Sequence, residues 1–220
     1  MRSACRSATG FLVLLWLGAA GLALAATEES LDDLTRVSSS KVDVLYVAHG
    51  ASLAKYHKVM LDPVDVAFKA DWRDRHPEVT GEDVARLRGQ FSASFHDSFV
   101  RELQVNGGYP IVTDPGSDVL EVRASIRNLD ISAPDTRAPG RPPTRYVISP
   151  GEMTLIAELR DSESGAILAR AADRKQGRQS GELEIATEAT NAAAAQRAFK
   201  FWAGLLRGAL DAAREGRAPP

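Results

Sequence analysis

Residues 152–174 read EMTLIAELRDSESGAILARAADR, and two alternating runs make up most of this stretch. Apolar and polar residues alternate over 152–161 and again over 165–174, with Ser-Glu-Ser and Gly165 between the two runs. A period of two is typical of β-strands, and a short polar connection that contains glycine indicates a tight turn. The stretch therefore predicts a β-hairpin.

More strands are predicted before this hairpin. Residues 109–114 and 42–47 are rich in strand-forming residues, and residues 64–68 alternate after Pro63, which cannot donate a ladder hydrogen bond and marks a strand start or edge. Residues 119–132 predict a long half-exposed strand. Its apolar side is made by Leu120, Val122, Ala124, Ile126 and Leu129.

Two long amphipathic helices are predicted from apolar residues at helical spacing. The first runs from about residue 82 to 104, where Thr80 followed by Asp83 resembles a capping arrangement and the glycines after Asn106 end the helix. The second runs from about residue 187 to 214. Its apolar stripe consists of Ala194, Ala195, Ala198, Phe201, Trp202, Leu205, Leu206 and Leu210.

The order of these elements predicts the fold class. Two long amphipathic helices need a shared surface, and a half-exposed sheet offers one. We expect a single α+β domain over residues 41–214, with a mixed or largely antiparallel sheet and both helices packed on one face. Residues 26–40 are expected to form a flexible lead-in, and residues 215–220 a disordered tail.

The first residues have the parts of a secretory signal peptide. Arg2 and Arg6 precede an apolar run that begins at Phe11 and ends in small residues. The run is shorter than the ~20 residues of a spanning helix, so cleavage is expected after Ala25. Cys5 precedes the run and cannot be a lipid-bearing lipoprotein cysteine. We expect a periplasmic or secreted protein, with an uncleaved membrane tether as the alternative.

Composition excludes several classes of function for the chain after cleavage. Cys5 is the only cysteine, so its removal excludes thiol catalysis, disulfides and cysteine metal sites. Of 27 basic residues, two lie in the signal, which leaves 25 against 29 acidic residues, a mildly acidic balance that argues against a nucleic-acid partner. No later segment is apolar enough to span a membrane after signal cleavage.

No catalytic residue, metal site or cofactor is predicted. The sequence has no nucleophile elbow, zinc-protease motif, P-loop or dinucleotide fingerprint. The four histidines lack the spacing of a metal pair on one element: His49, His57, His76 and His96. His49 and His57 could meet across a turn with Asp62 nearby, but two solvated surface histidines are the simpler interpretation.

Residues 55–68, KYHKVMLDPVDVAF, place Tyr56 and His57 just before a strand. An imidazole that titrates near neutrality suits acid–base chemistry, whereas a polar rim at a strand entry needs no chemistry. We favour the rim and keep both residues as candidate binding residues.

Two basic regions are the other candidates for binding. Residues 133–151 contain five prolines and two glycines and carry Arg137, Arg141 and Arg145, and long loops on a sheet often bind ligands. The second region carries Arg170, Arg174, Lys175 and Arg178. Guanidinium groups suit phosphate and carboxylate partners, although arginines also solubilise loops.

The stretch VDVLYVAHGASLAKYHKVMLDPVDVAF, residues 42–68, resembles the bacterial exported proteins of the domain of unknown function 3313 family. Their hallmark is a similar YVxPGAxLxxYxxVxLDPVxVxF pattern. The later LRDSESGAILARAADRK is similar to that family's hairpin. The resemblance implies an envelope protein. Many members are lipoproteins, whereas Cys5 of this chain cannot carry a lipid. The chain also departs from the family pattern at Ala48 and His49, where other residues, often Arg and Pro, are expected. The resemblance implies no activity and no catalytic residues.

The sequence therefore favours a non-catalytic periplasmic binding or interaction module, whose partner is an envelope protein or an anionic envelope component. One alternative is an envelope hydrolase whose histidine and carboxylate are brought together by folding. Another is a peripheral membrane or assembly factor that presents Phe199, Phe201 and Trp202 of the last helix.

Overall fold

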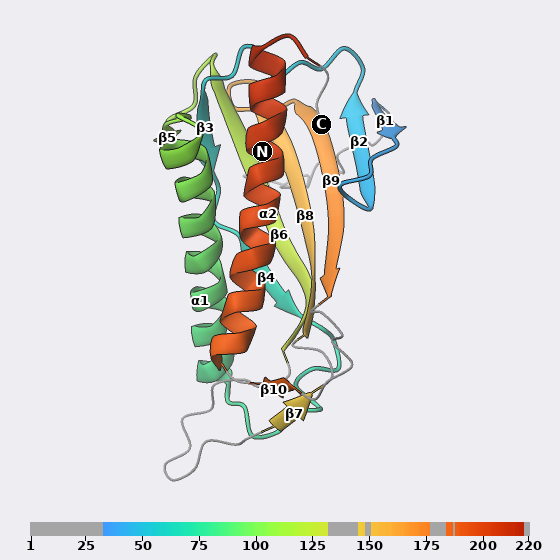
Figure 1. The fold of residues 1–220 in the computed structure, drawn as a ribbon, viewed down its shortest axis with the longest axis vertical. Helices are drawn as coiled ribbons and strands as arrows, with labels where there is room; N and C mark the ends of the chain where they lie inside the picture. Colours follow the sequence, from blue (N-terminus) through green and yellow to red (C-terminus); the bar gives the residue numbers. More distant parts are fainter. Residues whose placement is uncertain (1–32, 132–144, 148–150, 177–183, 187, 218–220) are drawn as a thin grey trace, which may run out of the picture. The chain divides into compact units, whose positions relative to one another are not determined.

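The long hairpin predicted around Gly165 lies at the centre of an eight-stranded sheet in the computed structural model (Figure 1). The structure describes residues 33–131, 145–147, 151–176, 184–186 and 188–217. Their elements, in chain order, are β1 (Leu34–Val37), β2 (Val44–Ala48), β3 (Lys58–Leu61), β4 (Asp65–Phe68), α1 (Gly81–Val100), η1 (Arg101–Asn106), β5 (Ile111–Val112), β6 (Val119–Ile131), β7 (Arg145–Val147), β8 (Gly151–Asp161), β9 (Ile167–Gln176), β10 (Glu184–Ala186) and α2 (Glu188–Arg214).

The sheet contains both parallel and antiparallel pairs. Its strand order is β1-β2-β9-β8-β6-β3-β5, with β4 also paired to β6, while β7 and β10 form a separate pair. β8 is antiparallel to β9 and to β6, and β3 and β4 run parallel to β6. The predicted α+β class with a mixed sheet is confirmed.

The predicted hairpin is formed by β8 and β9. The Gly165 amide donates to the Asp161 carbonyl at 2.8 Å and closes the turn. Gly165 has φ +71°, a conformation that costs glycine little because it has no Cβ. The local sequence pattern was therefore sufficient to place this element.

Residues 56–58 correct the sequence-based prediction. Lys58–Leu61 form β3, between β6 and β5, where the pattern predicts only a turn or rim. Pro63 cannot donate to a ladder, so the stretch forms two short strands, β3 and β4, on the same neighbour β6. The side chain of Tyr56, expected on the rim, is buried with 2% of its surface exposed.

A bulge in β6 explains an irregular apolar pattern. Ile126 and Leu129 lie three positions apart, yet both are fully buried. Asn128 has φ +53°, and the pairing of β6 with β8 changes register between Arg127 and Asp130. One bulge therefore returns Leu129 to the side of Ile126.

The first helix begins as its sequence predicts. The Thr80 hydroxyl accepts from the Asp83 amide at 3.1 Å, and the Asp83 carboxylate accepts from the Thr80 amide at 3.1 Å, which makes a capping box. α1 ends at Val100 and continues into the π-helical turn η1, which Gly108 follows with φ +70°. The predicted second helix is confirmed as α2.

Aromatic side chains join the two helices. Phe199 of α2 meets Phe91 and Phe95 of α1 edge-on, with ring centroids 6.4 and 5.5 Å apart. Figure 1 shows α2 in front of β6 and β8, with α1 beside it. The core lies between these layers and includes Phe99, Leu120 and Ile126.

Candidate functional site

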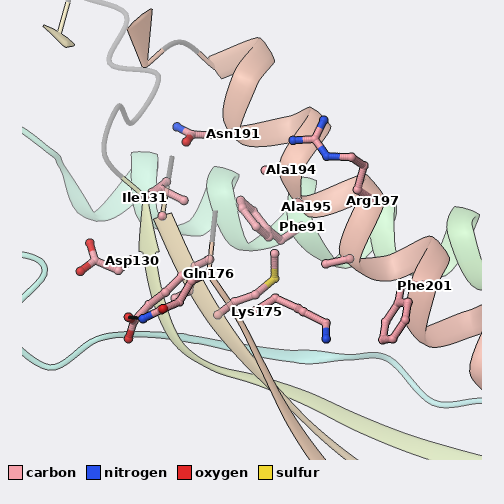
Figure 2. Close-up of a pocket in the computed structure, with 15 residues that line it drawn as sticks. Phe91, Asp130, Ile131, Lys175, Gln176, Asn191, Ala194, Ala195, Arg197 and Phe201 are labelled. Carbon is pink, nitrogen blue, oxygen red and sulfur yellow. Dashed lines mark hydrogen bonds between the residues drawn. The ribbon is translucent and has the colours of Figure 1, made fainter. Parts of the chain in front are cut away.

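A cavity of about 250 Å³ lies where β6 ends, β8 begins and α2 crosses them (Figure 2). Its lining residues come from five elements, α1, β6, β8, β9 and α2. They are Phe91, Leu129, Asp130, Ile131, Gly151, Glu152, Met153, Lys175, Gln176, Asn191, Ala194, Ala195, Arg197, Ala198 and Phe201.

The wall of this first cavity is apolar and its space comes from small side chains. Phe91, Leu129 and Met153 are buried at the wall. α2 contributes the alanines 194, 195 and 198 where larger residues would fill the space. Apolar walls with a few polar groups are the usual make-up of a ligand pocket.

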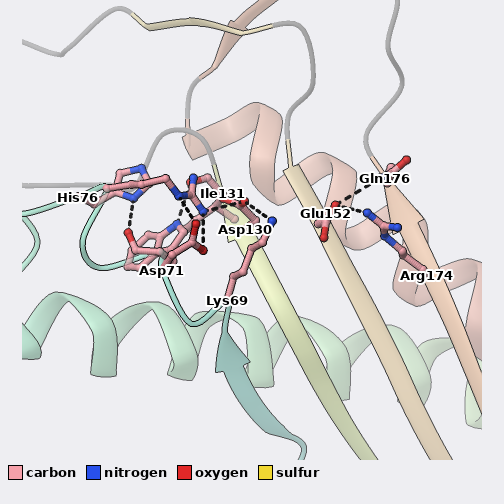
Figure 3. Close-up of polar contacts among 10 residues, drawn as sticks. Lys69, Asp71, His76, Asp130, Ile131, Glu152, Arg174 and Gln176 are labelled. Atoms are coloured by element: carbon pink, nitrogen blue, oxygen red, sulfur yellow. Dashed lines mark hydrogen bonds and ion pairs between the residues drawn. The ribbon is translucent and has the colours of Figure 1, made fainter.

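The two carboxylates at this cavity are already neutralised (Figure 3). Asp130 accepts from the Arg75 guanidinium at 2.8 Å and lies 3.8 Å from the Lys69 ammonium. Glu152 accepts from Arg174 at 2.6 Å, and this hydrogen bond holds the pKa of Glu152 below its usual value. The acids therefore do not repel an anionic ligand strongly.

Two cations lie at the same cavity. The Lys175 ammonium is 2.8 Å from Asp173 and 4.3 Å from the centroid of the Phe201 ring. Arg197 is exposed and makes no ion pair within the part of the chain that the structure describes. Arg197 is therefore the guanidinium most accessible to an anion at this cavity.

The first cavity also lies at both ends of the proline-rich segment. Ile131 precedes residues 132–150, Gly151 follows them, and both line the cavity. The Trp72 indole donates to the Ile131 carbonyl at 3.1 Å, and the His76 ring stacks on Trp72 with centroids 4.6 Å apart. A buried aromatic anchor thus fixes the point where the segment begins.

The predicted site residues lie only partly within the described part of the chain. Arg137 and Arg141 lie outside the described residues, and of Arg145 only the backbone is described, paired with Ala186. His57 is exposed. Tyr56 is the one whose environment is unusual.

Tyr56 takes part in a buried polar cluster around Asp161. The Tyr56 hydroxyl and the Lys55 ammonium donate to Asp161 Oδ2 at 2.8 and 2.7 Å, and the Ser164 amide and hydroxyl donate to Oδ1 at 2.9 and 2.8 Å. Burial raises the pKa of Tyr56 to about 12. The hydrogen bond from Lys55, followed by those from Ser164 and Tyr56, holds the pKa of Asp161 well below its usual range.

This cluster joins two stretches that are far apart in the sequence. Tyr56 lies in the stretch before β3, and Asp161 begins the turn of the hairpin, 105 positions later. All oxygen atoms of Asp161 have donors, and the cluster does not line the first cavity. The cluster therefore has the arrangement of a structural contact, which holds the hairpin turn against the stretch before β3.

The second basic region is occupied by ion pairs. Arg170 pairs with Glu158, Arg174 with Glu152, and Lys175 with Asp173. Arg178 lies outside the described residues. These cations therefore stabilise the sheet rather than standing free for a partner.

Among the described residues one histidine lies beside a carboxylate: His96 Nδ1 is 3.7 Å from Asp97 Oδ1, and both side chains are exposed. The His76 ring is buried and its Nδ1 donates to the Trp72 carbonyl at 2.8 Å, whereas His49, His57 and His96 are exposed. No histidine lines the first cavity. Among the described residues no group of three or more histidine or acidic side chains is placed to hold a metal ion.

The last helix buries two of its three aromatic residues. Phe199 and Trp202 are 0% and 3% exposed, and the Trp202 indole donates to Asp173 at 2.6 Å. Phe201 is 39% exposed. Across the described ranges, no helix combines the length and apolarity that crossing a membrane requires.

Sequence reasoning missed the first cavity. Its lining is drawn from residues 91 to 201, so no local pattern brings them together. The run of alanines in α2 was visible but has the same spacing as an ordinary apolar stripe.

The comparisons with known proteins identify a family and no activity. The family described as "Protein of unknown function (DUF3313)" matches residues 26–206. No functionally curated protein matches the chain.

Several solved structures are similar at low identity. They include the PelC dodecamer of Paraburkholderia phytofirmans (11% identity, TM-score 0.35, 76% of this chain and 95% of that chain covered). A candidate lipoprotein of Caulobacter crescentus (13%, 0.37, 76% and 96%) and a Xanthomonas campestris protein of the DUF330 family (13%, 0.40, 73% and 88%) are others. At these identities and TM-scores, none of them carries a conclusion about this chain.

Proposed function

Because the chain belongs to the DUF3313 family of proteins of unknown function, its own geometry has to carry the argument, and we propose that it is a non-catalytic binding module of the cell envelope. The observation that carries this proposal is the first cavity. It combines an apolar wall with one exposed cation, Arg197, while its carboxylates and Lys175 are already paired.

The ligand of the proposed module is an anionic envelope component with an apolar part. The apolar part enters between Phe91 and the α2 alanines, and the anion contacts Arg197. Arg137, Arg141 and Arg145 stay in the proposal as predicted contacts. Support for them is that Ile131 and Gly151, which flank their segment, both line the cavity.

The remaining expectations belong to the same proposal. Residues 1–25 act as a cleaved signal peptide, and the protein works in the periplasm or is secreted. The single domain predicted over residues 41–214 begins earlier, because β1 (Leu34–Val37), which lies in the expected flexible lead-in of residues 26–40, pairs with β2 of the main sheet. The two amphipathic helices pack on one face of the sheet. Support for the helix packing comes from Phe99 of α1 and Trp202 of α2, which line one cavity together with sheet residues.

A photo-crosslinking experiment in intact cells tests the proposal. Phe201, which is partly exposed and lines the first cavity, is replaced by benzoylphenylalanine in the full chain. After irradiation, adducts are isolated through a C-terminal tag and identified by mass spectrometry. We expect one dominant adduct, in which the mass added to the protein equals that of the intact, uncleaved ligand.

Two matched variants decide whether the adduct forms in the cavity. Ala194→Phe fills the space, because Ala194 lines the cavity, whereas Ala192→Phe adds the same side chain at an exposed position of α2. We expect Ala194→Phe and Arg197→Glu to remove most of the adduct and Ala192→Phe to keep it. An adduct that survives in folded Ala194→Phe protein, or a ligand recovered as a cleaved product, would contradict the proposal.

A further inference from the structure

A second cavity of about 170 Å³ lies between α2 and the part of the sheet formed by β2, β9 and β8. In Figure 1, β9 and β2 emerge beside α2 and are not covered by it. The sheet residues Leu45, Ala169 and Ala171 are accordingly only half-buried. The full lining is Ser39, Lys41, Val42, Leu45, Phe99, Val122, Leu155, Ala157, Leu159, Ala169, Ala171, Trp202, Leu205, Leu206 and Ala209.

Small side chains on both layers make this second cavity. Ala157, Ala169 and Ala171 from the sheet face Ala209 of α2 across the space. Protein interiors are close-packed, so space of this size between a helix and a sheet is uncommon. An enclosed apolar cavity of about 150 Å³ accepts apolar guests. The second cavity is open on one side, and its volume of about 170 Å³ is in the same range.

The mouth of the second cavity carries a single charge. Ser39 Oγ accepts from the amides of Lys41 and Val42 at 3.1 and 3.3 Å and so fixes the turn before β2. Lys41 is exposed, and within the described residues its ammonium group has no ion pair or hydrogen bond. No acidic residue lines the cavity, so the charge at its mouth favours an anion.

We propose that the second cavity binds a single-chain anionic amphiphile, with the hydrocarbon chain between α2 and β9 and the acidic headgroup on Lys41. The space suits a hydrocarbon chain rather than a partner helix, which is about 10 Å across with its side chains. A free fatty acid and the acyl chain of an anionic phospholipid share this chemistry. The site is separate from the first cavity, and neither proposal requires the other.

Calorimetry with decanoate on the full-length chain tests this site. We expect decanoate to bind with a stoichiometry of one, and decanol, which lacks the charge, to bind more weakly. Lys41→Ala should weaken decanoate by several-fold and leave decanol unchanged. Vesicles that contain an anionic phospholipid distinguish the source of the ligand. If the protein sediments with these vesicles but does not bind decanoate, the single-chain proposal is overturned.

Neighbouring alanines on β9 provide the matched control. Ala171 lines the cavity, and Ala172 points to the opposite face of the sheet because successive strand residues alternate. Ala171→Leu should weaken the binding of decanoate by about tenfold or more, because the leucine side chain occupies the space of several methylenes. Ala172→Leu should leave the affinity unchanged. If Ala171→Leu fails to fold, Ala209→Leu fills the cavity from α2.

Other outcomes would overturn the proposal. Unchanged decanoate affinity in a folded cavity-filling variant would place the binding elsewhere. A dimer in analytical ultracentrifugation that Ala171→Leu dissociates, without decanoate binding, would assign the cavity to self-association. Ala194→Phe in the first cavity should leave decanoate binding unchanged, so the failure of one site does not imply failure of the other.

Discussion

At the scale of single residues, the buried hydrogen bond between Tyr56 and Asp161 links the stretch before β3 to the hairpin turn. A buried phenol needs a partner, because an unsatisfied polar group in the interior is costly. Asp161 meets that need and also receives the Ser164 amide and hydroxyl, which order the turn. These contacts give Tyr56 a structural role, and its role in binding stays a prediction.

The first prediction removes the hydroxyl alone. Tyr56→Phe should lower the free energy of unfolding by about 1–2 kcal/mol, because Asp161 loses one donor in a buried place. Urea denaturation at pH 7 measures the change. Tyr46→Phe is the control, since the Tyr46 hydroxyl has no hydrogen bond within the described residues. Equal losses of unfolding free energy in both variants would show that the hydrogen bond from Tyr56 to Asp161 does not stabilise the fold.

The second prediction concerns pH. The pKa of Asp161 is lowered in the folded protein, chiefly by Lys55, so the ionised carboxylate stabilises the fold. This stabilisation is present above about pH 4, the pKa range of an unfolded aspartate, and is lost as the pH falls further toward the folded pKa. Asp161→Asn should therefore be less stable than the parent at pH 7, with a difference that shrinks in acid.

Urea denaturation from pH 7 to pH 3 tests this dependence, with Asp74→Asn as the control. Asp74 is exposed and has no ion pair within the described ranges. A difference between parent and Asp161→Asn that stays constant with pH would show that the charge of Asp161 is not what stabilises the turn.

At the scale of elements, short sequence signals and long-range pairing contribute differently. The Thr80–Asp83 capping box and the Gly165 turn are local, because their partners lie within four residues. The β6 bulge is set by pairing with β8, where Asn128 takes a positive φ so that Leu129 reaches the core. Asparagine tolerates this conformation better than most residues.

The third prediction tests the bulge with two substitutions at one position. Asn128→Ala should cost about 1 kcal/mol, because a Cβ disfavours positive φ, whereas Asn128→Gly should stay within about 0.5 kcal/mol. Thermal or urea unfolding measures both. Loss of the same stability in both variants would point to an interaction of the asparagine side chain instead.

At the scale of the whole molecule, α2 holds the sheet and α1 together. Trp202 donates to Asp173 of β9, Phe199 meets two phenylalanines of α1, and Arg207 pairs with the buried Glu102 of η1 at 3.1 Å. The same helix borders both cavities. Its alanines leave the space that the two proposals assign to ligands, and its aromatic residues maintain the packing around that space.

The fourth prediction separates the buried from the exposed aromatic residues of α2. Trp202→Ala should lower the free energy of unfolding by about 3–5 kcal/mol, because it removes a buried indole and leaves Asp173 without this donor. Phe201→Ala should cost less than about 1 kcal/mol. Urea denaturation compares the two variants. A loss of less than about 1 kcal/mol in Trp202→Ala would favour the alternative in which this helix contacts a membrane or a partner.

Elements with a strong local signal were determined by the sequence itself. The hairpin of β8 and β9, the long strand β6, the capped start of α1 and the extent of α2 follow from alternation, helical spacing and turn chemistry between near neighbours. That Cys5 is the only cysteine, and that the chain has none of the catalytic motifs searched for, also came from the sequence.

Only the tertiary structure decided features that join distant residues. The strand order, the separate strand β3, the burial of Tyr56 against Asp161 and the two cavities each combine residues far apart in the chain. A periodic pattern records which side of an element is apolar but not which other element covers it. Coverage depends on how the layers pack, and incomplete coverage by α2 is what leaves room for the proposed ligands.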